Sequence, residues 1–379
     1  MAAITYKLTI NKWSVDSAND ARTEFIMLDT QHSIDLSADY CRITVYAPPP
    51  PKPGLLEQAA SMVAAQVGLG GGASQSFSVS VRGNPIKHGD QITVELTVDN
   101  TATTIFTAEV NSIKSSLGQT VITGTTGKQK LANARLNQTY SNQGLDQITK
   151  DLAQQASVTA GDIQSGANYS YFVVHDAKSV LRQLQELAFR DGMDIYCDAD
   201  NKLVLKKFQK TSADHTFYYG IHVLDLQLWN YDVVSDHFKV YGESPSSKQG
   251  SDTWHWFAKD LSPFTGEIGS GGKLLAVQDS AAKTKDAAGN LATAKAGALK
   301  DRASQGLLKI LGNPLVKLGD AIEIKDAPKP ELNGLFKVIS VRHVLSKWQG
   351  YLTFVGFSGQ GGAQTAAGAL GQLAGAVGL

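Results

Sequence analysis

The chain contains little cysteine and little charge for its length. Only Cys41 and Cys197 occur in 379 residues, far apart and outside any C-x-x-C pair. We therefore expect neither a disulfide framework nor a zinc site. Charged residues make up 18% of the chain, below the roughly 25% usual in soluble proteins. Low charge together with 36 glycines predicts a β-rich protein with large protein–protein contacts.

An excess of one sign of charge is also missing, because 35 basic residues balance 35 acidic ones. Nucleic-acid-binding proteins normally carry a basic surplus, so no nucleic-acid partner is predicted. The N-terminus lacks the basic and apolar regions of a secretory signal. The most apolar segments, 55–69 and 361–379, are too short or too weakly hydrophobic to span a membrane. They also lack the cationic face of an interfacial helix, which favours docking in an assembly over stable membrane insertion.

Each partial match to a catalytic, cofactor-binding or metal-binding motif lacks residues that the motif requires. The segment 124–129 (GTTGKQ) is similar to part of a phosphate loop. The full motif needs a Gly five residues before Gly127, where Ile122 stands, and a Ser or Thr after Lys128, where Gln129 stands. The segment 198–209 starts like a calcium loop but lacks its central Gly and its final Glu, so it reads as a hairpin turn. The eight histidines show no metal-ligand spacing. We expect no enzyme, catalytic residue, cofactor or metal. Paired catalytic carboxylates stay an alternative, because such residues come together only in the folded chain.

One pattern occurs twice. Gly89-Asp90 precedes an alternating strand and then the segment 106–113, and Gly319-Asp320 precedes a similar strand and then 336–341. Each copy reads Gly-Asp-x-Ile-x-apolar, then an aromatic residue, then a strand ending in Ser-apolar. Such a recurring unit indicates one small β-domain used twice. Glycine permits positive φ and aspartate bonds its own turn, so Gly89, Asp90, Gly319 and Asp320 are predicted structural turn residues.

The hydrophobic period changes along the chain and divides it into domains. The predicted divisions are a first β-domain at 1–135 with an insertion at 48–75, an α+β domain at 136–212, a second β-domain at 213–358 with an insertion at 244–305, and a Gly/Ala-rich tail at 359–379. The first β-domain opens with an expected strand over Tyr6–Val15. The second insertion is expected to end in an Ala-rich helix over 287–311.

In the α+β domain, an apolar stripe predicts one amphipathic helix. Val180, Leu181, Leu184 and Leu187 fall on one face at helical spacing, and we expect them to pack the domain. Asp176 is the expected N-cap of this helix, and Asp191-Gly192 is the expected end.

The segment 179–196 (SVLRQLQELAFRDGMDIY), followed by 201–205 (NKLVL), resembles the late control protein D family. That family supplies baseplate hubs of phage tails and the hub part of type VI secretion spike proteins. The segments 312–314, 318–320, 332–338 and 341–346 match its closing strands. The resemblance covers about residues 1–358.

This resemblance implies a mainly β fold with α+β content, in which two tube-like β-barrel domains flank a small α+β domain. Three chains would then present six similar barrels, so that the homotrimer could join a six-fold inner tube to a three-fold spike. The implied function is the structural baseplate hub of a contractile phage tail-like injection system, such as a phage tail or tailocin.

The partners implied are the spike protein, the inner tube protein and baseplate wedge proteins, with the tape measure protein or a cargo as further candidates. The implied location is the baseplate of a virion or tail-like particle that is assembled in the bacterial cytoplasm. Type VI spike proteins continue into an oligonucleotide-binding-type domain and a β-helical needle. This chain does not, so we expect the spike to be a separate polypeptide.

Two other functions stay open from the sequence. A tail-associated cell-wall hydrolase would show muralytic activity. A membrane-active binding protein would bind liposomes and lose that binding on deletion of 361–379.

Overall fold

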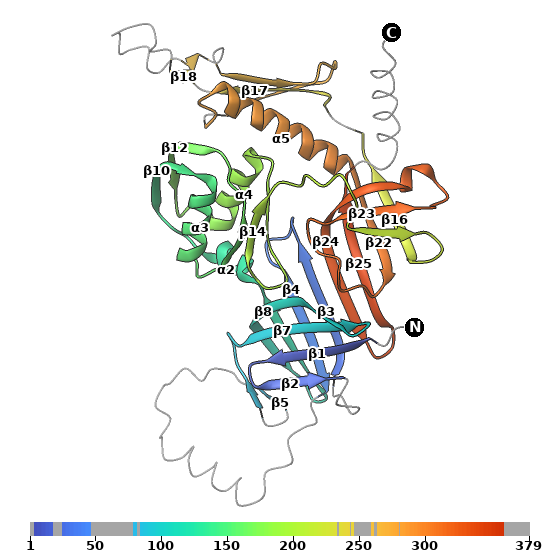
Figure 1. Ribbon diagram of the computed structural model, residues 1–379. Coiled ribbons are helices and arrows are strands. Elements are labelled where there is room, and N and C mark those ends of the chain that lie inside the picture. The colour runs from blue at the N-terminus through green and yellow to red at the C-terminus, as the bar shows by residue number, and fades with distance from the viewer. Residues whose placement is uncertain are drawn as a thin grey trace, which may run out of the picture. The chain divides into compact units, whose positions relative to one another are not determined.

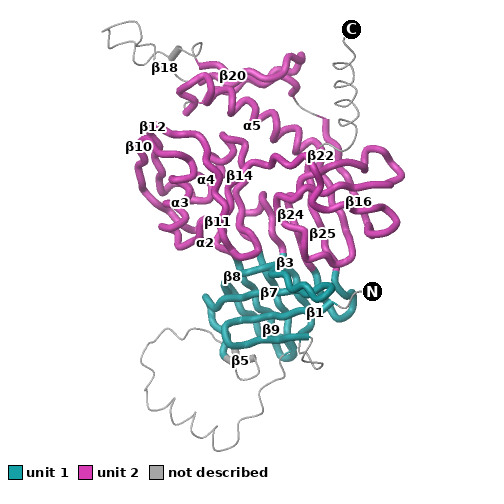
Figure 2. Tube along the Cα trace, viewed as in Figure 1, with its two compact units in different colours: residues 1–30, 40–125, 344–351 teal, residues 31–39, 126–343, 352–379 magenta. Residues whose placement is uncertain are grey.

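The computed structural model describes residues 4–17, 25–46, 79–81, 84–232, 235–242, 244–245, 259–260, 264–279 and 281–359. The predicted insertion at 48–75 and the tail beyond Gly359 lie outside the described residues. The chain forms two compact units, which Figure 2 shows in different colours. Unit 1 comprises residues 1–30, 40–125 and 344–351, and unit 2 comprises 31–39, 126–343 and 352–379.

Unit 1 is built mainly from one antiparallel sheet (Figure 1). Its strands are β1 (Thr5–Ile10), β2 (Trp13–Asp16), β3 (Phe25–Ser33, through Thr30 in this unit), β4 (Tyr40–Tyr46), β7 (Gln91–Val98), β8 (Thr101–Ser115) and β9 (Gln119–Thr125). They lie in the order β3-β4-β9-β8-β7-β1-β2. The short strands β5 (Val79–Val81) and β6 (Asn84–Ile86) pair as a separate hairpin.

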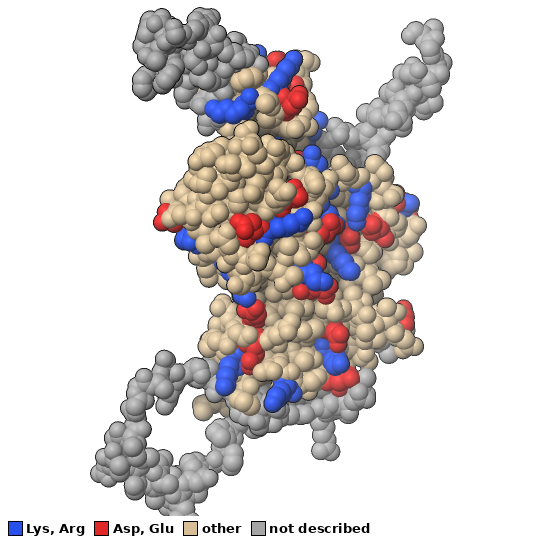
Figure 3. Space-filling model, turned by 60° about the vertical axis from the view of Figure 1, so that its left-hand side comes forward, with Lys and Arg blue, Asp and Glu red and all other residues tan. Residues whose placement is uncertain are grey.

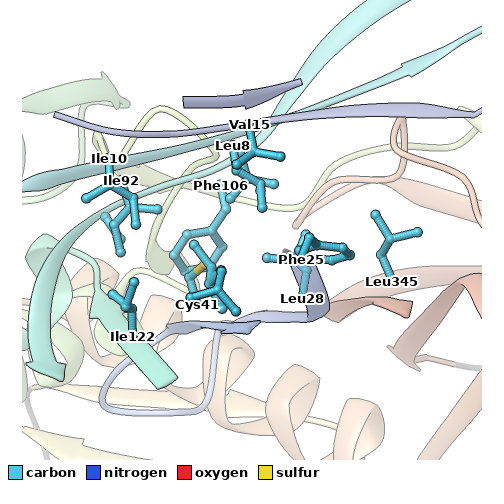
Figure 4. Packing of buried hydrophobic residues seen from close by; sticks show 14 of the residues in the cluster. Leu8, Ile10, Val15, Phe25, Leu28, Cys41, Ile92, Phe106, Ile122 and Leu345 are labelled. Carbon is cyan, nitrogen blue, oxygen red and sulfur yellow. The ribbon is translucent and has the colours of Figure 1, made fainter. Parts of the chain in front are cut away.

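Alternating side chains of these strands fill the core of unit 1. On β7, Ile92, Val94 and Leu96 are fully buried while the residues between them are not. Figure 4 shows Leu8, Ile92 and Phe106, from three strands, in one cluster. Because a one-residue slip would turn every buried side chain outward, this apolar face fixes the register of the strands.

The single strand expected over Tyr6–Val15 is wrong, because the segment is a hairpin. Asn11 adopts φ 52°, in the left-handed region that asparagine tolerates, and reverses the chain. β1 and β2 then pair antiparallel, with Ile10 opposite Trp13.

The α+β part of unit 2 contains three helices and two small sheets. The helices are α2 (Gly127–Asn133), α3 (Leu145–Gln155) and α4 (Val180–Arg190); the strands are β10 (Gln138–Gly144), β11 (Ala160–Ile163), β12 (Asn168–Val174), β13 (Asp194–Cys197) and β14 (Leu203–Lys206). β10 pairs with β12, and β11-β14-β13 form the second sheet. Apolar side chains from all three helices and both sheets share one core.

The prediction that Asp176 caps α4 is wrong. Ser179 is the N-cap, and its hydroxyl oxygen accepts a hydrogen bond from the Arg182 amide at 3.2 Å. The predicted end is as expected: Asp191 is the C-cap, and Gly192 follows with φ 66°.

A second group of strands in unit 2 surrounds a separate core. These elements are β15 (His215–Tyr218), β16 (Val223–Asn230), β22 (Ser304–Leu311), β23 (Ala321–Lys325), the 3-10 helix η3 (Pro330–Leu332), β24 (Gly334–Ser346) and β25 (Gly350–Ser358). β16, β22, β25 and β24 follow one another in the sheet. β23 pairs antiparallel with β24 and parallel with β15.

The described part of the segment between β16 and β22 contains a three-stranded sheet covered by a helix (Figure 1), and a separate pair of short strands. Its elements are β17 (His237–Gly242), β18 (Ser244–Pro245), β19 (Lys259–Asp260), β20 (Thr265–Ile268), β21 (Leu274–Asp279) and α5 (Lys285–Ala303). α5 packs on β17 and β20. The helix expected over 287–311 is wrong at its end, because residues 304–311 form β22.

The prediction of a mainly β chain with α+β content is confirmed, and antiparallel pairing dominates its large sheet. The domain boundaries at 135, 212 and 358 stay a prediction.

Candidate functional site

The first Gly-Asp pair closes a tight turn between β6 and β7. Gly89 has φ 85°, a backbone conformation that glycine adopts without steric cost. Its amide donates to the carbonyl of Val110 on β8 at 2.9 Å, and the Val110 amide donates back to the carbonyl of Asp90 at 2.8 Å. The Asp90 carboxylate accepts from the Lys87 amide at 2.8 Å. The aspartate thus closes its own turn, and two backbone hydrogen bonds join the turn to β8.

The second Gly-Asp pair repeats this arrangement bond for bond. Gly319 has φ 75°, and its amide donates to the carbonyl of Val338 on β24 at 3.0 Å. The Val338 amide donates to the carbonyl of Asp320 at 2.9 Å. The Asp320 carboxylate accepts from the Lys317 amide at 2.8 Å. The sequence repeat therefore corresponds to one turn-and-hairpin unit built twice.

The aromatic residues of the repeat are offset by two positions in this register. Phe106 lies opposite Val94 on β7, whereas Phe336 lies opposite Ile322 on β23. Since side chains on a strand alternate with a period of two, an offset of two residues keeps the ring on the same face. Phe106 and Phe336 are accordingly both buried in their cores.

The side chains around the two turns differ. The Asp90 carboxylate accepts one further bond, from the amide group of Asn11 at 3.3 Å. Asp320 instead meets Lys210 and His215, with Lys210 Nζ 3.1 Å from Oδ1 and His215 Nε2 3.1 Å from Oδ2. Lys210 also bonds Asp214 at 2.6 Å. The second turn is therefore held by an ionic network that the first lacks.

This network sets the charge of Asp320. Burial alone would raise the pKa of the Asp320 carboxyl, but the hydrogen bonds from His215, from the Lys317 amide and from Lys210 hold the pKa below its usual range. Lys210 responds in the opposite direction: burial alone would lower its pKa, yet Asp214 and Asp320 raise it. These partners could not be predicted from sequence spacing, because Lys210 and His215 stand more than 100 positions before Asp320.

The predicted stripe of α4 lies inside the α+β core. Val180 and Leu184 are fully buried, and Leu181 and Leu187 are nearly so. These side chains share their cluster with residues of α2, α3 and both small sheets.

The lysine of the incomplete phosphate loop is an internal structural residue. Lys128 is fully buried on α2. Its ammonium group donates to the carbonyls of Ser33 and Ile34, and it lies 3.8 Å from the carboxylate of Asp39. A buried lysine with these partners does not present its charge to a nucleotide.

Cys41 and Cys197 are unbridged and fully buried. Burial raises the pKa of the Cys197 thiol to about 12, and the nearby charge of Asp39 adds to the shift. Burial likewise raises the pKa of the Cys41 thiol. Neither thiol is an activated nucleophile, since activation requires a lowered pKa.

Over the described residues, no cluster of three or more His, Cys, Asp or Glu side chains could hold a metal ion. None of the described helices is long and apolar enough to cross a membrane. On the face shown in Figure 3, basic and acidic side chains are interspersed, and broad areas carry neither. The two features described above are a hairpin built twice and an α+β core.

Comparison with protein-family models gave no match, and comparison with curated proteins gave none. Solved structures do match over nearly the whole chain. A 43 kDa tail protein of prophage MuSo2 from Shewanella oneidensis is 11% identical with a TM-score of 0.64, over 93% of this chain and 98% of that one. A tail protein from Neisseria meningitidis MC58 is also 11% identical with a TM-score of 0.64, over 94% and 96%.

A third match is an E. coli component of the type VI secretion system, described as structurally similar to the bacteriophage T4 tail proteins gp27 and gp5. It is 9% identical with a TM-score of 0.51, over 94% of this chain and 77% of that one. The resemblance to the hub family is thus confirmed at the level of the fold.

Proposed function

We propose that this chain is the structural baseplate hub of a contractile phage tail-like injection system, and that it acts through geometry and without catalysis. One observation carries the proposal: the Gly89-Asp90 and Gly319-Asp320 turns form the same set of hydrogen bonds, each on its own β-hairpin. One chain therefore offers two similar β-modules.

Two similar modules in one chain allow a three-fold assembly to match a six-fold partner. Three copies around a three-fold axis present six modules, which can meet a six-fold ring on one side while the trimer keeps three-fold symmetry on the other. In this proposal the homotrimer nucleates the inner tube and seats a separate spike protein, and baseplate wedge proteins surround it. The fold shared with tail and type VI secretion proteins supports this role.

The scarcity of charge fits an assembly protein. Obligate interfaces bury large, mostly apolar areas, and only 18% of this chain is charged. We place the protein in the baseplate of a virion or tail-like particle that is assembled in the cytoplasm.

Tube nucleation tests the proposal. Purified inner tube protein would be mixed with the full chain, with the spike protein, or with both, and followed by light scattering and electron microscopy. We expect fast tube growth only with both, and tubes that carry this chain at one end. Equal growth without the chain, with no chain bound to the tubes, would overturn the proposed function. Peptidoglycan and liposomes treated with the same preparation test the hydrolase and membrane alternatives.

A further inference from the structure

The two β-modules correspond strand by strand. The first module comprises β3, β4, β8 and β9, and the second comprises β16, β22, β24 and β25. β8 and β24 carry the amides of Val110 and Val338, which bind the two Gly-Asp turns. From β8 the sheet continues through β9 and β4 to β3, and from β24 it continues through β25 and β22 to β16. β16 therefore has the place in the second module that β3 has in the first.

β3 of the first module has a further neighbour in the sheet, which is β24 of the second. Two backbone hydrogen bonds flank this pairing. Within unit 1 the Lys347 amide donates to the carbonyl of Ile26 at 3.4 Å, and within unit 2 the Ile34 amide donates to the carbonyl of Ile339 at 2.9 Å. Because the position rises along one strand as it falls along the other, the pairing is antiparallel. We call this β3–β24 pairing the module junction.

The equivalent edges, on β16 and β8, form no such junction. Over the described residues, β16 pairs with β22 alone. The pairing of β8 with β7 ends at Glu109, and from Val110 to Ser115 the described ladder joins β8 to β9 alone. Since Val110 is equivalent to Val338, residues 111–115 of β8 correspond to residues 339–343 of β24, where the junction lies. One chain thus contains one complete junction and both halves of another.

Burial distinguishes the joined edges from the open ones. No residue of β3 is exposed, whereas none of the eight residues of β16 is buried. β24 likewise has no exposed residue after Val338, whereas residues 111–115 of β8 include no buried one. The strands compared are equivalent in the two modules, so we attribute the difference to the neighbour that β3 and β24 provide for each other.

The open edge of β16 has the chemistry of an interface. Its sequence, VLDLQLWN, contains neither lysine nor proline, which commonly protect an edge strand from pairing, and its bulge falls at the first residues. Leu224 and Trp229 are 52% and 44% exposed. Leu226 and Leu228 pack against the core of the second module but stay partly exposed, whereas Leu308 on β22 is fully buried. A further strand along β16 would cover these side chains and pair with the backbone groups of the edge.

We propose that β16 of one chain pairs with segment 111–115 of β8 in a second copy of the chain, and so repeats between chains the junction that β3 and β24 form within one. The occupant is a second copy because β8 is the counterpart of β24, the strand that fills the equivalent position beside β3. Each chain then uses β16 on one side and β8 on the other, a heterologous contact that can close into a ring.

The inference rests on the proposed function for the number of chains. Three chains in a ring contain three junctions within chains and three between chains, all built from equivalent strands. Such a ring repeats one strand arrangement six times, as a six-fold partner requires, although the molecule has only three-fold symmetry.

Photocross-linking identifies the strand that β16 meets. p-Benzoylphenylalanine would replace Trp229 in the full chain, and trimers would be assembled from isotope-labelled and unlabelled copies, alone or with the spike protein. After irradiation, peptide masses show which segments are joined and whether they come from different copies. We expect position 229 of one chain to be joined to the peptide that contains residues 111–115 of another. A product with β16 of the other copy, or with another segment, would overturn the proposed pairing.

A charge on the same edge tests the contact by assembly. Lysine on an edge strand opposes strand pairing, so Trp229→Lys should raise the concentration at which the trimer dissociates by about tenfold or more. Trp229 is partly exposed, so the separated variant chain should melt like the separated parent. The matched control is Trp348→Lys, because Trp348 is 77% exposed in the turn between β24 and β25. This control should dissociate like the parent.

The outcomes distinguish a wrong contact from a wrong function. If the parent is a trimer and Trp229→Lys dissociates at the same concentration as the parent, the β16 contact is wrong while the hub proposal stands. If the parent is a monomer with and without the spike protein, both are wrong. A parent trimer whose Trp229→Lys variant dissociates, and no longer starts tube growth in the nucleation assay, supports both.

Discussion

Replacing Asp90 and Asp320 by alanine, one at a time, should destabilise the two hairpins by different amounts. In each turn the carboxylate accepts from a backbone amide at 2.8 Å. Loss of that bond costs about 0.5–1.5 kcal/mol. Asp320 additionally accepts from Lys210 and His215 at 3.1 Å, and its side chain is only 16% exposed. Hydrogen bonds to charged groups contribute about 1.5–3 kcal/mol, but Lys210 keeps Asp214 as a partner. We therefore expect a loss of about 1 kcal/mol for Asp90→Ala and about 2–3 kcal/mol for Asp320→Ala.

Native-state hydrogen exchange measures the stability of both hairpins, because each hairpin has one backbone amide in an equivalent position. The Val110 amide donates to the carbonyl of Asp90, and the Val338 amide donates to the carbonyl of Asp320. Protection of each reporter should fall in its own variant, and more in Asp320→Ala. The asparagine variants are the controls, because asparagine keeps an acceptor for the turn but loses the charge: Asp90→Asn should stay near the parent, while Asp320→Asn should lose protection. Equal losses in the two alanine variants would refute the claim that only the second turn depends on an ionic network.

Two further substitutions test the packing. Leu184→Asp places an unpaired charge in the α+β core and should lower the free energy of unfolding by several kcal/mol, seen as loss of soluble folded protein. The control is Gln185→Asp, at a partly exposed neighbouring position. A Leu184→Asp chain that melts like the parent would contradict the burial of α4. Gly266→Ala puts a methyl group against the backbone of Ala288 on α5 and should lower the free energy of unfolding by about 1–3 kcal/mol through overpacking, with amide hydrogen exchange rising first in α5. The control is Gly272→Ala, where the structure leaves open space, and its stability should change little.

Local patterns account for the predictions of the α4 stripe and of the two Gly-Asp turns. The stripe of α4 follows from the 3.6-residue period within eight residues of chain. The Gly-Asp turns follow from the special φ of glycine and the self-bonding of aspartate. Both need only neighbours in sequence, so both could be placed before the fold was known.

The errors have local causes too. In Tyr6–Val15 the buried positions shift from even (Leu8, Ile10) to odd (Trp13, Val15), and this change of parity marks a turn that simple alternation hides. In 287–311 the helix ends before Gly306, and the following residues alternate between buried and partly exposed, as in a strand.

The networks could not have been predicted, because their partners come from distant parts of the chain. Asp320 meets His215 across 105 positions, and Lys128 meets the carbonyl of Ser33 across 95. Sequence spacing holds no information about such contacts. Lys128 stood in an incomplete phosphate loop, and only its burial shows that it is a structural residue.

The native mass of the protein decides whether three chains assemble. One chain is 40.4 kDa, so a homotrimer is about 121 kDa. The measurement would be made on the chain alone and after co-expression with the proposed spike protein. We expect a trimer, or a complex of three chains with three spike chains. A monomer in both preparations, with no spike bound, would contradict the adaptor and leave the duplicated hairpin without a role in assembly.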